Sequence, residues 1–407
     1  MVEQPSLKRS INYPLLTLYG LGTIVGAGIY VLVGEVVNQS GIFAPFSFLL
    51  AALIATFTAF TYAELSSRFP RSAGEAYYSY QAFHKKLVSR IIGWSIVIIG
   101  VVSSATIANG FVGYFHVYVD APAWLVIAGI ILFLSLIAVW GIRESVWLAS
   151  IVTVIELSGL LFVIYIVTQL DFHQPIAIND MVPALDSSVW FGITLGAFLA
   201  FYAFIGFEDI VNVAEEVIHP RRTLPLGILT ALVISTLLYV SVSIAAIYAV
   251  PLAKLSASDA PLIDIVEQYG ESAVLVMGFI SMVAIVNGAL IQIIMASRVI
   301  YGMACQQLAP AIFSHVNAKT QTPLWSTGLI ATIVLILALS FSLVTLAKIT
   351  SFVTLLVFAT MHLSLILIKR KEPNPQYAMI YPAWISLLGL IVTVALILFQ
   401  FWASWIA

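Results

Sequence analysis

The sequence has very few of the charged side chains that a water-soluble protein of its length needs. Only 9% of its 407 residues are charged, while 61% are hydrophobic. A soluble chain of this size would lack the polar side chains to cover its surface. The composition therefore excludes a soluble globular protein and predicts a protein that lies in a lipid bilayer.

Cysteine is also nearly absent, since Cys305 is the only one. A single cysteine forms neither an intramolecular disulfide framework nor a multi-cysteine metal site. The apolar segments contain no His-Glu-x-x-His motif and no mid-membrane serine with lysine or histidine, so an intramembrane enzyme is not expected. We expect no enzymatic activity, no cofactor, no metal site and no nucleic-acid partner.

Long apolar runs, in contrast, are abundant. A helix needs ~20 mostly apolar residues to cross a hydrocarbon core of ~30 Å. We predict an all-α membrane protein with one transmembrane domain, 1–407, and about eleven transmembrane helices, at 14–37, 42–66, 91–118, 121–140, 146–170, 188–217, 225–250, 272–303, 323–342, 345–368 and 380–405. The termini and connections are too short to form a separate soluble domain.

Lysine and arginine are distributed unevenly between the predicted connections. The segment 171–187 contains no lysine or arginine, and only Lys254 and Lys348 fall clearly on the same side. The other side carries Lys8, Arg9, Arg68, Arg71, Lys85, Lys86, Arg90, Arg143, Arg221, Arg222, Lys319, Lys369, Arg370 and Lys371. The positive-inside rule then predicts a multi-pass protein of the inner (cell) membrane with a cytoplasmic N-terminus and, after eleven spans, an external C-terminus.

Glycines lie near the middle of the first and sixth predicted spans. The first contains Gly22, Gly26 and Gly28, and the sixth contains Gly206. Glycine weakens a helix interior by about 1 kcal/mol relative to alanine, which favours local unwinding. Close helix packing is the alternative explanation. Because the two spans are five helices apart, a duplicated five-helix unit would be inverted, and matched interruptions in inverted halves point to a transporter binding site.

Several motifs together carry a resemblance to a known family. They include Gly22 to Tyr30, the run Tyr62-Ala63-Glu64-Leu65-Ser66-Ser67-Arg68-Phe69-Pro70, Phe204-Ile205-Gly206-Phe207-Glu208, Ala214-Glu215-Glu216-Val217, and Ala296-Ser297-Arg298. In their order and spacing these motifs resemble the amino acid, polyamine and organocation transporter family, in its amino acid permease branch. The resemblance spans nearly the whole chain.

The resemblance implies a leucine-transporter-like fold with two inverted five-helix repeats and broken first and sixth helices. The repeats would cover about 14–170 and 188–368, with an extra helix at about 380–405. The family commonly has twelve spans, whereas this chain has eleven predicted ones.

An amino acid substrate needs hydrogen-bond donors for its carboxylate and acceptors for its ammonium group. Broken helices expose both kinds of backbone group. The donors would be the N–H groups of Gly26, Ala27 and Gly28, and the acceptors the carbonyls of Ile24, Phe204 and Ile205. Family members use the matching positions in this way.

The side-chain pocket is expected to include aromatic residues at the sixth-span break, beside Gly206. Tyr202, Phe204 and Phe207 are the candidates, and no lysine or arginine lies near mid-membrane in these two spans. A neutral amino acid is therefore favoured. Glu208 provides an alternative, because it would suit a basic amino acid or a polyamine, while a structural or gating role beside the break is preferred for it.

Coupling requires a group that changes charge or binds an ion. Glu156 lies in the middle of the fifth predicted span, where an ionised carboxylate is costly unless it is paired or protonated. Some proton-coupled relatives carry a lysine at about this place. Glu156 is therefore a candidate proton carrier, with a sodium ligand or a structural pair as alternatives. Asn287, in the eighth span, is a candidate for hydrogen bonding at the site.

The sequence thus predicts a secondary active transporter for a small, neutral amino acid, with proton-coupled symport as the favoured mechanism. Basic amino acid or polyamine transport, obligate exchange, and an amino acid sensor without net flux remain alternatives. The residues do not indicate an oligomeric state.

Overall fold

The computed structural model describes residues 9–71, 74–140, 146–169, 182–305, 307–317, 320 and 322–406. Lys8, Arg143, Lys319 and most of the segment 171–187 therefore lie outside the described residues. Within the described ranges the regular secondary structure is helical, apart from one isolated parallel bridge between Ile11 and Val217. The predicted all-α architecture is confirmed at this level.

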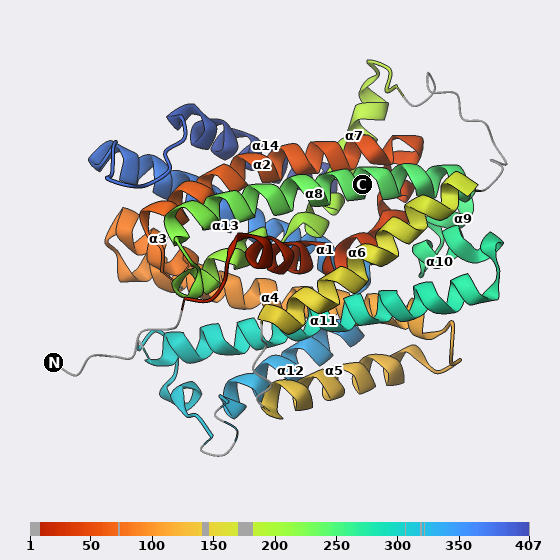
Figure 1. Ribbon diagram of the computed structural model, residues 1–407, viewed down its shortest axis with the longest axis horizontal. Helices are drawn as coiled ribbons and strands as arrows, with labels where there is room; N and C mark the ends of the chain where they lie inside the picture. The colour runs from red at the N-terminus through yellow and green to blue at the C-terminus, as the bar shows by residue number, and fades with distance from the viewer. Residues whose placement is uncertain are drawn as a thin grey trace.

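The first half of the chain forms six helices (Figure 1). They are α1 (Tyr13–Ser40), α2 (Ala44–Arg68), α3 (Gly74–Phe83), α4 (Lys86–Phe115), α5 (Ala123–Trp140) and α6 (Val146–Gln169), with a short 3₁₀ turn η1 (Gly41–Phe43) between α1 and α2. Asn12 caps α1 by accepting the Leu15 N–H at 3.1 Å, and Pro14 occupies its first turn. Both features are typical of the start of an α-helix.

The second half begins with a helix in three pieces, α7 (Ser187–Ala200), η3 (Phe201–Phe204) and η4 (Phe207–Glu216). The remaining elements are α8 (Pro220–Ala249), α9 (Leu252–Ser256), α10 (Pro261–Val266), η5 (Glu267–Tyr269), α11 (Glu271–Cys305), η6 (Ala311–Ser314), α12 (Leu324–Ser340), α13 (Leu343–Lys371) and α14 (Ala383–Ile406). Asp186 caps α7 through the Ser188 N–H at 2.7 Å.

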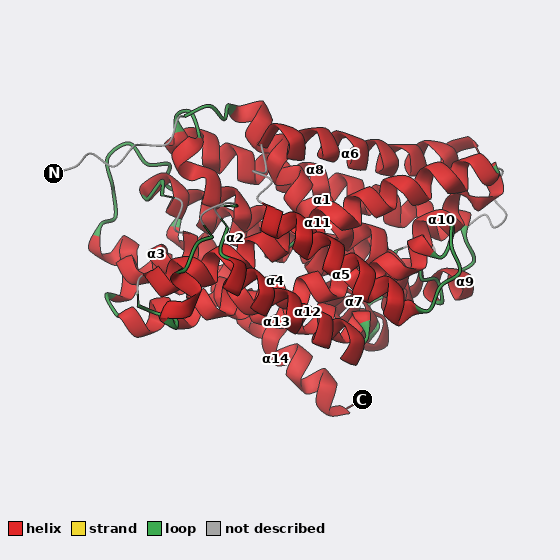
Figure 2. Ribbon diagram, turned by 90° about the horizontal axis from the view of Figure 1, so that it is seen from below, coloured by secondary structure: helices red, strands yellow, loops and turns green. Residues whose placement is uncertain are grey.

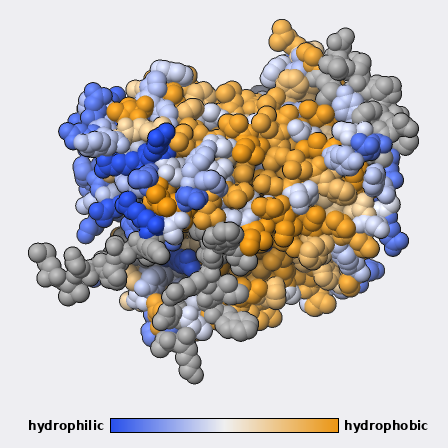
Figure 3. All heavy atoms as spheres, in the orientation of Figure 1, coloured by the Kyte–Doolittle hydropathy of each residue, from blue (hydrophilic) through white to orange (hydrophobic). Residues whose placement is uncertain are grey.

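Eight described stretches are long and apolar enough to cross a membrane, and three shorter apolar helices accompany them. Every one of the eleven predicted ranges is largely helical, with boundaries that differ by a few residues. An apolar belt covers the middle of the molecule, while hydrophilic side chains gather at its two ends (Figure 3). The number of membrane crossings, eleven, stays a prediction.

The basic residues of α2, α8 and α13 meet at one end of the bundle, which we call the basic end. Arg68 donates to the Glu372 carbonyl at 2.8 Å, and Arg221 donates to the Gln376 carbonyl at 3.2 Å. The N-terminal segment reaches the same end, because the Ser10 N–H bonds the Glu216 carbonyl at 2.9 Å. α14 starts there and lies at the rim of the bundle, with the C-terminus away from the basic end (Figure 2).

Glu64 is the centre of the hydrogen bonding at the basic end. It is fully buried, and its carboxylate lies 2.7 Å from Arg68 Nη2 and 2.7 Å from Lys369 Nζ. It also accepts the Tyr381 N–H at 2.9 Å. A single carboxylate thus joins α2, α13 and the segment that leads into α14.

We predict that Arg68→Leu lowers the melting temperature of the purified protein strongly. Removing one partner of a buried ion pair leaves the other charge incompletely compensated, which typically costs about 3–5 kcal/mol. Thermal unfolding in detergent is the measurement, with the exposed Arg370→Leu as the control. Equal melting temperatures for the two variants would show that the buried Glu64 carboxylate does not need Arg68 for its stabilisation.

Candidate functional site

α1 is interrupted at its centre. Gly26 has non-helical dihedral angles, φ −9° and ψ −139°, inside an otherwise continuous helix. Such an interruption frees backbone N–H and C=O groups from the helical hydrogen-bond pattern. The backbone of Ala27 belongs to α1, but its side chain lies outside the described residues. The predicted break in the first span is therefore present at Gly26.

The second interruption separates η3 from η4. Ile205 is extended, with φ −63° and ψ 135°, and Gly206 has a φ of 125°, which favours glycine. Glu208 Oε2 accepts the N–H of Gly206, the residue before η4, at 2.8 Å. Of the two roles considered for Glu208, the structural hydrogen bond beside the break is thus observed.

The two interruptions lie against each other. A Cβ atom on Gly206 would come within 2.2 Å of the Thr23 carbonyl oxygen, and one on Gly28 within 2.5 Å of Ala203 Cα. A Cβ on Gly26 would meet only Gly288 Cα, at 3.8 Å. Close packing therefore explains Gly28 and Gly206, whereas the surroundings of Gly26 are open.

Tyr239 of α8 connects the two interruptions through its hydroxyl group. The hydroxyl lies 2.8 Å from the Ile24 carbonyl oxygen and 2.9 Å from the Ala203 carbonyl oxygen. One hydroxyl proton serves only one of these acceptors at a time. The ring is fully buried and packs edge-on against Phe204, with centroids 5.0 Å apart. No sequence pattern distinguished Tyr239 from the other tyrosines of the chain, so its role was not predicted.

A cavity of about 30 Å³ lies where the interruptions meet. Of the predicted site residues, Ile24, Gly26, Gly28, Tyr202 and Ile205 line it. Phe204 and Gly206 pack beside it instead, against Tyr239 and the Thr23 carbonyl. This volume is about the share of one molecule in liquid water, so the cavity must widen before an amino acid fits.

α4 and α11 supply the rest of the wall of this cavity. Ser103 and Ile107 come from α4, and Gly288, Ile291 and Gln292 from α11. Ser103 Oγ lies 2.9 Å from the Tyr202 hydroxyl, which holds that ring against α4. None of the described residues that line the cavity is charged.

Glu156 and Asn287 lie together outside this cavity. Glu156 is fully buried, and Asn287 Nδ2 donates to its Oε1 at 3.1 Å. Its Oε2 has no hydrogen-bond partner among the described residues. The Tyr30 hydroxyl donates to the Glu156 backbone carbonyl at 2.6 Å. Asn287 therefore contacts the coupling candidate, and its predicted contact with substrate stays a prediction.

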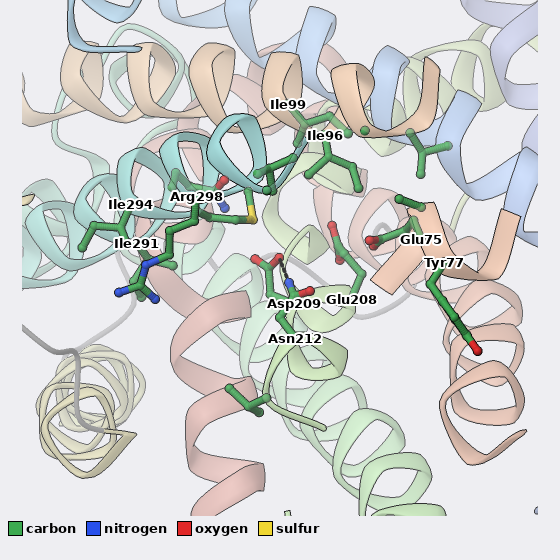
Figure 4. A pocket seen from close by; sticks show the side chains of 18 of the residues that line it. Glu75, Tyr77, Ile96, Ile99, Glu208, Asp209, Asn212, Ile291, Ile294 and Arg298 are labelled. Atoms are coloured by element: carbon green, nitrogen blue, oxygen red, sulfur yellow. Dashed lines mark hydrogen bonds between the residues drawn. The ribbon is translucent and has the colours of Figure 1, made fainter. Parts of the chain in front are cut away.

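A second cavity, of about 1050 Å³, extends towards the basic end, and Figure 4 shows part of its lining. It shares Ile205, Ile291 and Gln292 with the small cavity, while Ser10 and Lys86 line it at the basic end. Glu75, Glu208 and Asp209 line one side, and Arg298 lies across from them. The sequence analysis had assigned no role to Glu75, Asp209 or Arg298.

The far side of the small cavity is tightly packed. Val31 fills the space beside Gly110, where a Cβ would come within 2.6 Å of its Cγ1. A Cβ on Gly34 would come within 2.6 Å of the Leu255 carbonyl oxygen of α9. The small cavity therefore adjoins the large cavity towards the basic end, while close contacts pack the helices on its opposite side.

We predict opposite outcomes for alanine at the two central glycines. Gly206→Ala places a side chain at positive φ and against the Thr23 carbonyl, so it should reduce stability by more than about 2 kcal/mol. Gly26→Ala should keep the fold, because its Cβ has space, and weaken substrate binding by filling the small cavity. Thermal unfolding and ligand-binding measurements on both variants separate the two effects.

We also predict that Tyr239→Phe destabilises the protein by about 1–3 kcal/mol, because a buried carbonyl loses its donor while the ring remains. The control is Tyr165→Phe, whose side chain is exposed on α6. Melting temperatures in detergent provide the comparison. Identical values for both variants would contradict a structural role for the Tyr239 hydroxyl.

Comparisons with known proteins identify the family of this chain. A family model described as amino acid permease matches residues 11–404. The chain is 30% identical to "Cationic amino acid transporter 3, mitochondrial" of Arabidopsis thaliana over 91% of its own length and 64% of that protein's length.

Two Bacillus subtilis (strain 168) proteins are also similar. One is the "Methylthioribose transporter", 29% identical over 91% of this chain and 84% of that protein. The other is the "Branched-chain amino acid permease BcaP", 28% identical over 97% of this chain and 88% of that protein. The chain belongs to the amino acid permease family, within the amino acid, polyamine and organocation superfamily of membrane transporters.

Proposed function

We propose that this protein is a secondary active transporter that carries a small, neutral amino acid by alternating access. Membership of the permease family makes it a multi-pass membrane transporter rather than an enzyme. The observation that carries the proposal is the small cavity at which the interruptions of α1 and the α7–η4 segment meet.

We propose that the helices form two inverted five-helix repeats, at about 14–170 and 188–368, followed by α14. In such a fold, each helix of the first repeat corresponds to the helix five positions later. Four of these pairs pack together, α1 with the α7–η4 segment, α2 with α8, α4 with α11 and α5 with α12. In addition, the short helix α3 follows α2, as α9 and α10 follow α8.

The basic end is proposed to face the cytoplasm. Arg68, Arg221 and Lys369 gather there, which fits the positive-inside rule. The large cavity then opens to the cytoplasm, and the conformation is inward-facing. The N-terminus is cytoplasmic, and the C-terminus, beyond α14, is external. We place the protein in the cell membrane.

Backbone groups at the interruptions are proposed to bind the two charged ends of the amino acid. The N–H groups of Gly26, Ala27 and Gly28 suit a carboxylate, since they lie at the start of the second part of α1. The carbonyls of Ile24, Phe204 and Ile205 suit the ammonium group. The Tyr239 hydroxyl already contacts Ile24 O, and the second lone pair of that oxygen can accept a hydrogen bond from the substrate ammonium group.

The wall of the small cavity favours a neutral side chain. Ile107, Ile205 and Ile291 are apolar, and Ser103 and Tyr202 offer hydroxyl groups. A basic amino acid or a polyamine is the second candidate, supported by the carboxylates of Glu75, Glu208 and Asp209 in the adjoining large cavity. A relative named for branched-chain amino acids fits the first candidate, and a relative named for cationic amino acids fits the second.

A thermal-shift screen of the purified protein with the common amino acids and polyamines tests the substrate class. We expect stabilisation by small neutral amino acids, because a ligand that binds the folded state raises its stability. Stabilisation by arginine, lysine or polyamines alone would favour the second candidate. Counterflow in proteoliposomes then tests transport, and binding without any flux would identify a sensor instead.

Glu156 is proposed to carry the coupling proton. Its buried Oε2 has no partner among the described residues, and a buried carboxylate in that position is best accommodated as the neutral acid. A sodium ion coordinated by Glu156 is the alternative, and obligate exchange requires neither ion.

We predict that Glu156→Gln abolishes pH-driven accumulation of substrate while counterflow continues, because glutamine keeps the shape and cannot change its charge. Uptake into proteoliposomes under an imposed pH gradient is the measurement. Glu271→Gln, at the start of α11, is the control and should accumulate substrate normally. Undiminished accumulation in Glu156→Gln would reject the proton-carrier role, and dependence on a sodium gradient would favour the alternative.

A further inference from the structure

The two walls of the large cavity carry opposite charges that do not meet. Asp209 and Glu208 come from η4, Glu75 comes from α3, and Arg298 comes from α11. Figure 4 shows Asp209 on the side of the three carboxylates that faces Arg298. None of the ion pairs found between the described residues involves any of these four side chains.

The three carboxylates are buried, and no cation of the described residues pairs with them. Glu75, Glu208 and Asp209 are only 6%, 7% and 7% exposed. Burial raises the pKa of the Glu75 carboxyl, an effect that its hydrogen bond from Tyr62 partly offsets. Carboxylates in such surroundings are stabilised by a nearby cation more than exposed ones are, because the local dielectric constant is lower.

Asp209 is the carboxylate with the fewest partners. Glu208 Oε2 is occupied by the Gly206 N–H at 2.8 Å, and Glu75 Oε1 by the Tyr62 hydroxyl at 3.0 Å. The side chain of Asp209 has only a long contact with Asn212 Nδ2, at 3.4 Å, among the described residues. It is therefore the carboxylate that is most available to a new partner.

Arg298 is exposed and lies on a different part of the bundle. Its helix, α11, packs closely on α4, where a Cβ on Gly100 would come within 3.0 Å of Ala296 Cβ. η4, in contrast, is attached to the segment that leads into α1, since the Ser10 N–H bonds the Glu216 carbonyl at 2.9 Å. A movement of η4 and α1 relative to α4 and α11 would therefore change the distance between Asp209 and Arg298.

We propose that Arg298 and Asp209 form an ion pair when the large cavity closes, and that this pair seals the cytoplasmic path in the outward-facing state. The proposal rests on the alternating access proposed above. Closure removes water from both groups, so each charge is then stabilised mainly by the opposite charge. The ion pair therefore stabilises the closed state relative to the open one. Arg298 is a gating residue that need not touch the substrate.

The test measures the outward-facing population without using transport. Cys305 is the only cysteine, so Cys305→Ser gives a cysteine-free parent. Val31→Cys then introduces a single reporter thiol in the second part of α1, where Val31 is 6% exposed and packs on Gly110. A membrane-impermeant maleimide added outside should label this reporter thiol only when the external path opens.

We predict that Arg298→Glu lowers the rate at which the reporter thiol is labelled from outside by about tenfold, within the usual range for coupling between two states. Arg298→Asp combined with Asp209→Arg should restore labelling, because the pair is rebuilt with exchanged charges. Arg298→Lys should retain most of it. Lys86→Gln is the matched control, since Lys86 also lines the large cavity and should have no effect.

Unchanged labelling in Arg298→Glu, or no recovery in the exchanged pair, would overturn the proposal. Loss of the fold cannot imitate the expected result, because unfolding exposes the reporter thiol and raises its labelling. If the parent with the reporter thiol is never labelled from outside, the proposal of alternating access is rejected, and the proposed ion pair is rejected with it. If that parent is labelled and Arg298→Glu is labelled equally, only the ion pair fails.

Discussion

Backbone N–H and C=O groups in the middle of a bilayer cannot bond to water, and the architecture of this protein depends on how it satisfies them. At the two interruptions the helical partners are missing. Glu208 supplies an acceptor for the Gly206 N–H, and Tyr239 supplies a donor for the Ile24 or the Ala203 carbonyl. The groups that remain are the ones that a zwitterionic amino acid can bind. The same constraint thus explains why side chains replace the missing helical hydrogen-bond partners, and which ligand the protein is proposed to carry.

Close packing of the interruptions determines how much space remains for that ligand. Glycine at 28 and at 206 lets the two backbones approach so closely that a Cβ at either position would overlap backbone atoms of the other segment. The remaining cavity measures about 30 Å³. An amino acid does not fit in this volume, and a cavity of about 1050 Å³ that shares lining residues with it lies beside it. Substrate binding in the small cavity, as proposed, therefore requires a conformational change.

Apolar runs and glycine positions predicted the helical segments and both interruptions, because these features depend on local sequence. The choice between a break and a packing contact at Gly26 and Gly28 could not be made in this way, since glycine serves both purposes and only the neighbouring segment decides. Tyr239 and Asp209 were missed for a related reason. Their roles depend on segments far away in the sequence, such as the contact between Tyr239 and Ile24, 215 residues apart.

The two ends of the proposed transport path differ in their packing. The end away from the basic residues is sealed by apolar and backbone contacts, with Val31 against Gly110 and Leu255 against Gly34. The ion pairs of Lys254 with Asp264 and Glu267 are more exposed there and contribute little to closure. The large cavity towards the basic end, in contrast, is lined by buried carboxylates, and closing it removes their water, which is costly unless they are paired or protonated. A cation can compensate them on closure, and among the described residues that line the cavity, Arg298 of α11 lies across from the carboxylates.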